Sequence, residues 1–205
     1  MPRSVLSDPI RNFKFKVTIS PDQSSGLRSY LGTDSIETGF SVVSGLTVQN
    51  EMIAYREGGM NTHPHKMIGQ SDFGPVTFTK GVFADNDALY KWQTFMHTWA
   101  QGDGNPGAAA TGNSDYRCDI TIHVFDHPVA DAKYELPNQD PVAHNSALKM
   151  AYKLHNCWPA SYSLGDLNAG DSSILIQQMV VNHEGFEIAW SSPGPNGTAT
   201  VSNFS

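Results

Sequence analysis

Eight histidines and two cysteines are the residues with which this 205-residue chain could bind a metal or attack a substrate. His63 and His65 stand close together with Pro64 between them, while His123 and His127 lie elsewhere in the chain. Zinc sites need three or four nitrogen, oxygen or sulfur ligands, and neither pair has a third nitrogen or sulfur ligand nearby. The pattern therefore favours solvated or interface histidines, and we expect no metal site.

Motifs of nucleophilic and phosphate chemistry are also weak. Cys118 and Cys157 lie in apolar, strand-like surroundings, which are typical of inert core thiols. Residues 102–107 (GDGNPG) match G-x-G-x-x-G, but they follow a predicted helix, whereas nucleotide binding needs a strand before the motif and a helix after it. The chain has neither a G-x-S-x-G motif nor a G-K-[S/T] sequence. We therefore expect no catalytic residue and no cofactor, and only a triad of scattered Ser, His and Asp side chains stays open.

Composition argues against several classes of protein. Lys and Arg total 13 and Asp and Glu total 20, so the formal net charge is −7. This acidic balance argues against a protein that binds DNA by neutralising phosphates. Charged residues are only 16% of the chain, below the usual ~25%, which fits a surface that is covered in an assembly. No apolar run reaches the ~18 residues of a membrane span, and no signal peptide is expected.

Hydrophobic spacing predicts a mainly β chain, whose strands would position these residues. Phe13, Phe15, Val17 and Ile19 alternate with polar residues, as in a half-buried strand. Further strands, giving about seven in all, are expected over residues 40–45, 46–56, 76–80, 116–125, 148–158 and 174–186.

One helix is expected after Asp85, which is a good N-cap residue. Leu89, Trp92, Met96 and Trp99 recur at spacings of three and four and form one apolar stripe. We expect the two tryptophans to pack this helix on a sheet. Together the elements predict a β sandwich or barrel with one flanking α-helix and a long extended hairpin.

The expected domain organisation is simple. Residues 1–190 would form one domain and residues 191–205 a C-terminal tail. Insertions are expected at about 20–35, 103–114 and 127–147, the first of them as a loop. Residues 161–172 are expected to be a turn-rich connection.

The hairpin over residues 46–82 is the most unusual expected element. Its two strands would be joined by a polar tip of residues 57–73, rich in Gly, His and Asn. A connection of this length is uncommon in a compact domain and is often functional. Arg56 and Glu57 would then lie where the hairpin leaves the sheet.

Seven short blocks, in one order along residues 8–186, carry a resemblance to a known family. They are DP at 8–9 with FKFKV at 13–17, GFSVVSGL at 39–46, IAYREGG at 53–59, GPVTFTKGV at 74–82, LYKW at 89–92, NCWPASY at 156–162 with DLNA at 166–169, and VNHEGF at 181–186. In this order the blocks resemble the tube proteins of phage tails and contractile injection systems. Compact members of that family lack much of the inserted segments.

The resemblance implies a structural role without catalysis. Six copies would form a hexameric ring whose strands join into a continuous inner β-barrel, and stacked rings would conduct phage DNA, or injected effectors, to the target cell. The expected partners are further copies of the chain, tail terminator, baseplate and tape-measure proteins, and a sheath protein if the tail contracts. DNA would pass through the lumen without specific binding. The expected location is the virion tail, assembled in the host cytoplasm.

Three alternatives stay open at this point. The chain could be a tube-end or baseplate homologue that is present in one ring rather than many. It could also be the tube of a headless contractile injection system. A monomeric β-rich enzyme or binding module is the remote alternative.

The resemblance and the strand alternation together predict two sets of site residues. The side chains expected to face the lumen are Gln49, Glu51, Thr77, Thr79 and Gln178. Inter-ring or inter-subunit contacts are expected from the hairpin residues Arg56, Glu57, Gly58, Gly59, His63, His65 and Lys66.

The two cysteines test the expected strand pairing. If residues 116–126 and 148–158 form a hairpin, Cys118 would lie opposite or diagonal to Cys157, near the ~5.5 Å Cα separation of a disulfide. A reducing cytoplasm favours free thiols. We therefore expect proximity without a bond.

Overall fold

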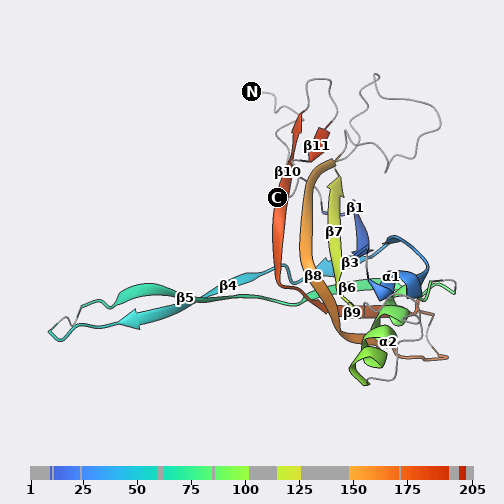
Figure 1. The fold of residues 1–205 in the computed structure, drawn as a ribbon, viewed down its shortest axis with the longest axis horizontal. Helices are drawn as coiled ribbons and strands as arrows, with labels where there is room; N and C mark the ends of the chain where they lie inside the picture. The colour runs from blue at the N-terminus through green and yellow to red at the C-terminus, as the bar shows by residue number, and fades with distance from the viewer. Residues whose placement is uncertain are drawn as a thin grey trace.

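The computed structural model in Figure 1 describes residues 10, 12–23, 25–59, 62–84, 86–101, 115–125, 148–170, 172–193 and 199–201. Within these residues the chain is mainly β. Its strands are β1 (Phe15–Pro21), β2 (Ile36–Thr38), β3 (Val42–Ser44), β4 (Val48–Tyr55), β5 (His65–Phe73), β6 (Val76–Gly81), β7 (Cys118–Phe125), β8 (Leu148–Leu164), β9 (Ile176–Asn182), β10 (Gly185–Pro193) and β11 (Ala199–Val201). Its helices are α1 (Gly26–Leu31) and α2 (Ala88–Gln101). The predicted fold class is confirmed. The prediction of about seven strands and one helix was too low, because the described residues form eleven strands and two helices.

Most strands belong to one antiparallel arrangement in the order β2-β1-β7-β8-β9-β6-β3. The long strand β8 joins two groups, because its first part pairs with β7 and β10 and its last part pairs with β9. Figure 1 shows β8 leaving β7 and β10 and curving toward β9. This bend allows the two groups of strands to share one core.

The bend in β8 has a local cause at Asn156, whose φ of 52° places it in the left-handed region. Asparagine occupies this region more readily than most residues with a Cβ. Its amide Nδ2 donates to Glu184 Oε2 at 2.6 Å, and its backbone N–H donates to Asp119 Oδ1 at 3.3 Å. A register shift between Pro159 and Ser161 follows. The strand therefore turns where side chains replace regular backbone pairing.

Helix α2 contributes its apolar stripe to the core. Leu89, Trp92 and Phe95 are buried, and Trp92 Nε1 donates to the carbonyl oxygen of Tyr116 at 2.8 Å. The prediction that Trp92 packs the helix on the sheet is confirmed. The predicted stripe omitted Phe95 and included Met96, which is half-buried. The helix therefore faces the core with a stripe rotated slightly from the predicted one.

Two predictions about this helix are affected by its boundaries. The helix begins at Ala88, three residues after the predicted N-cap residue Asp85, so the predicted start of the helix was wrong. Asp85 itself lies outside the described residues. The side chain of Trp99 also lies outside the described part of the chain.

Helix α1 corrects the prediction that residues 20–35 form a loop. Ser25 caps the helix by accepting from the N–H of Leu27 at 3.1 Å, and Gly32 ends it with a φ of 70°. Leu27 is fully buried. A helix of six residues carries too little periodicity to be predicted from a segment rich in Gly and Ser.

Three other segments differ from the predicted strands. Residues 65–73 form β5 rather than part of a tip, and residues 161–164 extend β8 rather than beginning a connection. Residues 174–186 divide into β9 and the start of β10, since the chain turns at His183 and Glu184. Strand β10 continues to Pro193 and pairs with β11, so the expected tail contains strand structure.

The two cysteines confirm the predicted pairing of β7 with β8. Cys118 and Cys157 are direct cross-strand partners, and both are buried, free thiols. Burial raises the pKa of Cys157 to about 12 and raises that of Cys118 as well, because a thiolate would lose its hydration. Both thiols are therefore protonated and unreactive at neutral pH.

The insertions expected at 103–114 and 127–147 lie outside the described residues, as does the G-x-G-x-x-G match over residues 102–107. Neither helix that the structure describes is long and apolar enough to cross a membrane.

Candidate assembly surfaces

Strands β4 and β5 form a two-stranded sheet of their own, which we call the arm. Figure 1 shows that the arm projects far from the rest of the molecule. Every residue of β4 is exposed, including Val48, Met52, Ile53 and Tyr55. An isolated two-stranded sheet is marginally stable in water, so an exposed arm of this kind gains stability when another surface covers it.

The predicted contact residues gather at the far end of the arm. Arg56, Glu57, Gly58 and Gly59 are exposed and follow the last residue of β4. They therefore lie at the tip, and the prediction that Arg56 and Glu57 lie where the hairpin leaves the sheet was wrong. The reason is that the arm continues through β4 and β5 instead of forming a loop after residue 56.

The remaining predicted contact residues are His63, just before the returning strand, and His65 and Lys66, on that strand. His65 and Lys66 begin β5 and pair with Tyr55 and Ala54, and both are exposed. The rings of His63 and His65 have centroids 6.2 Å apart. Among the residues that the structure describes, no group of three His, Cys, Asp or Glu side chains could hold a metal ion.

The root of the arm is held by an aromatic cluster. Phe73, the last residue of β5, lies 5.7 Å from the ring of His183 and 6.0 Å from that of Phe186, measured between centroids. Buried His183 Nε2 lies 3.1 Å from the carbonyl oxygen of Gly74, so this nitrogen carries the proton and donates. The Gly74 N–H donates to the carbonyl oxygen of Thr47 at 3.1 Å. These contacts fix the direction in which the arm leaves the body.

Close backbone approach at the root requires glycine. Gly45 has a φ of 98°, and a Cβ there would collide with the carbonyl oxygen of Pro75. A Cβ on Gly74 would likewise collide with Thr47 Oγ1. At Gly45 the chain that enters the arm therefore passes the chain that leaves it in a space that only glycine fits, whereas at Gly74 the Thr47 hydroxyl could rotate away.

A second candidate surface lies on β3, β6, β9 and β8. Their register gives two cross-strand rows, Ser44–Thr77–Val180–Ser161 and Val42–Thr79–Gln178–Ser163. The alternate residues Val76, Phe78, Met179 and Val181 are buried, so the rows point away from the core. Neither row contains a charged side chain, and we call this surface the neutral face.

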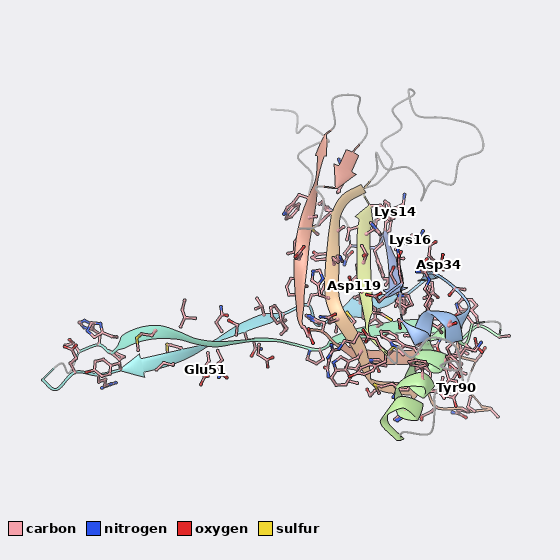
Figure 2. The ribbon with its side chains drawn as sticks, in the orientation of Figure 1. Lys14, Lys16, Asp34, Glu51, Tyr90 and Asp119 are labelled. Carbon is pink, nitrogen blue, oxygen red and sulfur yellow. The ribbon has the colours of Figure 1, made fainter. Side chains whose placement is uncertain are left out.

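The neutral face unites three of the five residues predicted to face a lumen. Thr77 and Thr79 lie on β6, and Gln178 on β9 is the direct partner of Thr79. Gln49 and Glu51 are on the arm instead, where Figure 2 labels Glu51. The serines of the neutral face were missed because their position depends on register between strands far apart in the sequence, which no local pattern reveals.

Open strand edges form a third candidate surface. Within the described residues, β3 pairs only with β6, and residues 185–190 of β10 pair only with β8. Strand β10 also exposes Ile188 and Trp190, the latter to 61%. Exposed edges with apolar side chains invite pairing with another chain. A small domain with open edges and a projecting arm defines a class of protein, the subunit of a larger assembly.

The sequence identifies which assembly this is. Residues 11–187 match the family described as T4-like virus tail tube protein gp19, and the chain belongs to that family. It is therefore a structural tail tube subunit of a virion or phage-like particle. No curated protein matches the chain in sequence.

Solved structures share the fold at low sequence identity. A chain of the sheath–tube complex of the PVC extracellular contractile injection system, in its extended state, is 22% identical with a TM-score of 0.61, covering 92% of this chain and 99% of that one. A chain of the anti-feeding prophage tube-terminating cap has the same identity and TM-score, covering 93% and 97%. A chain of the anti-feeding prophage baseplate is 17% identical with a TM-score of 0.60, covering 89% and 96%.

Proposed function

We propose that six copies of this chain close into a ring by pairing their open edges, and that the rings stack into a hollow tube. The arm carries this proposal, because its exposed two-stranded sheet would be only marginally stable alone and would gain stability when other copies cover it. Ring closure would also pair the edges at β3 and β10, which removes the aggregation hazard of exposed strands. The contact residues at the arm tip, from Arg56 to Lys66, would then reach the adjacent ring.

The neutral face is the proposed lining of the lumen. Its hydroxyl and amide side chains offer no positive charge to hold phosphates. Six copies would carry six times −7, or −42, formal charges, which repel a polyanion. DNA would therefore slide through without specific binding. Gln49 and Glu51 would add to the lining where the proximal arm borders the lumen.

The partners follow from the same proposal. The structures with the same fold come from a sheath–tube complex, a tube-terminating cap and a baseplate. We propose corresponding contacts for this chain with a terminator, a baseplate and a tape-measure protein, and with a sheath if the tail contracts. Assembly would take place in the host cytoplasm, and the chain would have no catalytic activity.

A concentration series on the purified full-length chain tests the ring and the tube. Sedimentation velocity should show a step from monomers to a single closed species, and electron microscopy should show rings and then tubes as concentration rises. A chain that stays monomeric at the highest soluble concentration would contradict the proposal.

A tube-end role is the second candidate function, because a tube-terminating cap structure matches this chain with the same TM-score as the sheath–tube structure. Such a subunit would form rings that do not elongate. The copy number in native particles separates the two roles, since a tube subunit recurs in many rings and an end subunit in one.

A further inference from the structure

The turn between β9 and β10 consists of two residues whose side chains contact different parts of the molecule. Strand β9 ends at Asn182 and β10 begins at Gly185, so the turn is His183 and Glu184. His183 Nε2 donates to the carbonyl oxygen of Gly74 at the root of the arm, whereas the side chain of Glu184 contacts β8. Because the two residues are adjacent in the chain, a contact that fixes Glu184 also restricts His183.

The carboxylate of Glu184 is held by two side chains. Asn156 Nδ2 donates to Oε2 at 2.6 Å, and a guanidinium nitrogen of Arg117 lies 3.7 Å from Oε1. A hydrogen bond to a carboxylate is shorter and stronger than one between neutral groups. The ion pair with Arg117 is about half exposed on both sides, and such pairs contribute little to stability. Asn156 is therefore the main anchor of Glu184.

Asn156 is itself held in place on β8. Its φ of 52° is a conformation that residues with a Cβ keep only where the surrounding contacts enforce it. Its N–H donates to Asp119 Oδ1 at 3.3 Å, and Asp119, which Figure 2 labels, also pairs with Lys153 at 3.3 Å. A continuous series of contacts thus leads from β7 and β8 through Glu184 and His183 to the arm.

The contacts of Glu184 are better suited to set a direction than to stabilise the core. Asn156 and Glu184 are both exposed, and exposed polar side chains usually contribute little to the free energy of unfolding. His183 is buried, however, and its ring contacts those of Phe73 and Phe186. A shift of the turn would therefore displace the ring that holds the last residue of β5.

We propose that Glu184 is a positioning residue for the arm, which acts through His183 by tying the turn to Asn156. This bond keeps the ring of His183 against Phe73 and Gly74, and so sets the angle at which the arm leaves the body. The inference rests on the proposed tube for its purpose, since an arm with a fixed direction loses less entropy on association. The position of the arm in a single dispersed chain tests it independently of the tube.

A distance in the dispersed chain provides the first test. Nitroxides attached through Glu57→Cys at the arm tip and His97→Cys on α2 report the tip-to-body distance by double electron–electron resonance, and the buried native thiols stay unlabelled. The distribution should be narrow with the native turn. Glu184→Ala should broaden it and leave the melting temperature nearly unchanged. Glu187→Ala is the matched control, because it removes a carboxylate further along β10 that lies 3.4 Å from His155 Nε2, and it should leave the distribution narrow.

A reversed pair provides the second test, which a merely structural role would not pass. Asn156→Asp alone sets a second carboxylate against that of Glu184 and should broaden the distribution, because like charges repel. Asn156→Asp combined with Glu184→Gln exchanges donor and acceptor, so the hydrogen bond forms again and the narrow distribution should return. Aspartate tolerates the left-handed region as asparagine does.

The outcomes separate this inference from the proposed function. A distribution that stays narrow in Glu184→Ala, or that the reversed pair does not restore, overturns the positioning role and leaves the tube intact. Equal broadening in Glu187→Ala overturns the role as well, since any lost charge on β10 would then suffice. A wild-type chain that never leaves the monomeric state overturns the tube, and the distance measurement still decides the role of Glu184.

Discussion

Lys80 is the least expected residue in the core. Its side chain is 1% exposed, and its Nζ donates to Thr38 Oγ1 at 2.7 Å and lies 5.8 Å from the ring centre of Phe83. None of the ion pairs found among the described residues involves it. Burial lowers the pKa of Lys80, because the ammonium group loses water without gaining a carboxylate. The strand β6 thus carries a charge at a position where alternation places an apolar side chain.

We predict that Lys80→Met stabilises the monomer by about 1 kcal/mol, because an apolar side chain of similar length removes the cost of desolvation. The lowered folded pKa sets the pH dependence. Between that pKa and the ordinary lysine value of 10.5, the unfolded chain binds more protons than the folded chain, so wild-type stability rises with pH. The advantage of the variant should therefore shrink from neutral pH toward pH 10.5.

Urea unfolding, followed by tryptophan fluorescence at concentrations below assembly, measures this difference. Lys66→Met, at an exposed position on the arm, is the control and should change the free energy of unfolding little. A loss of about 2 kcal/mol or more in Lys80→Met would show that the hydrogen bond to Thr38 outweighs desolvation.

At the scale of elements, the direction of the arm depends on the contacts at its root. Strand β5 has no burial of its own, and only Phe73 at its end is drawn into the body beside His183 and Phe186. A hydrogen bond from His183 and two ring contacts act on the adjacent residues Phe73 and Gly74, and these contacts restrain the direction of the arm at its root. A fixed direction lowers the entropy that assembly would otherwise cost.

We predict that His183→Ala loosens the arm and lowers the free energy of unfolding by about 1–3 kcal/mol, from one hydrogen bond and the lost ring contacts. A nitroxide attached through Glu57→Cys at the arm tip reports mobility by electron paramagnetic resonance, and its spectrum should sharpen. The buried thiols do not compete for the label.

His97→Ala, at an exposed position on α2, is the matched control and should leave the spectrum unchanged. An equally unchanged spectrum in His183→Ala would mean that the root does not set the direction of the arm.

At the scale of the whole molecule, the open edge of β10 is the edge that would pair with a neighbouring copy in the proposed ring. Natural proteins block unwanted edge pairing with charged side chains, and here the edge strand exposes Ile188 and Trp190 instead. We predict that Ile188→Lys leaves the monomer folded, with a similar melting temperature, but abolishes rings in sedimentation velocity. His97→Lys, on the helix, should assemble normally. Assembly of Ile188→Lys at the wild-type concentration would place β10 outside the ring junction.

Local sequence patterns predicted the elements that bury one face in the core and expose the other. Alternation located β7, and the apolar spacing in α2 identified Trp92 as a core residue. The pairing of Cys118 with Cys157 was predictable because a hairpin places nearby strands side by side. Strand β5 was not predictable, since its sequence mixes polar and apolar residues on both faces and no core selects one of them.

The amino-acid sequence by itself determined the mainly β class, the family and the lack of a recognisable catalytic motif, because each depends on residue types and short spacings. Only the tertiary structure decided the neutral face, the root of the arm and the contact of Asn156 with Glu184. These features depend on register between strands distant in the sequence, and a shift of one residue would exchange every inward side chain for an outward one.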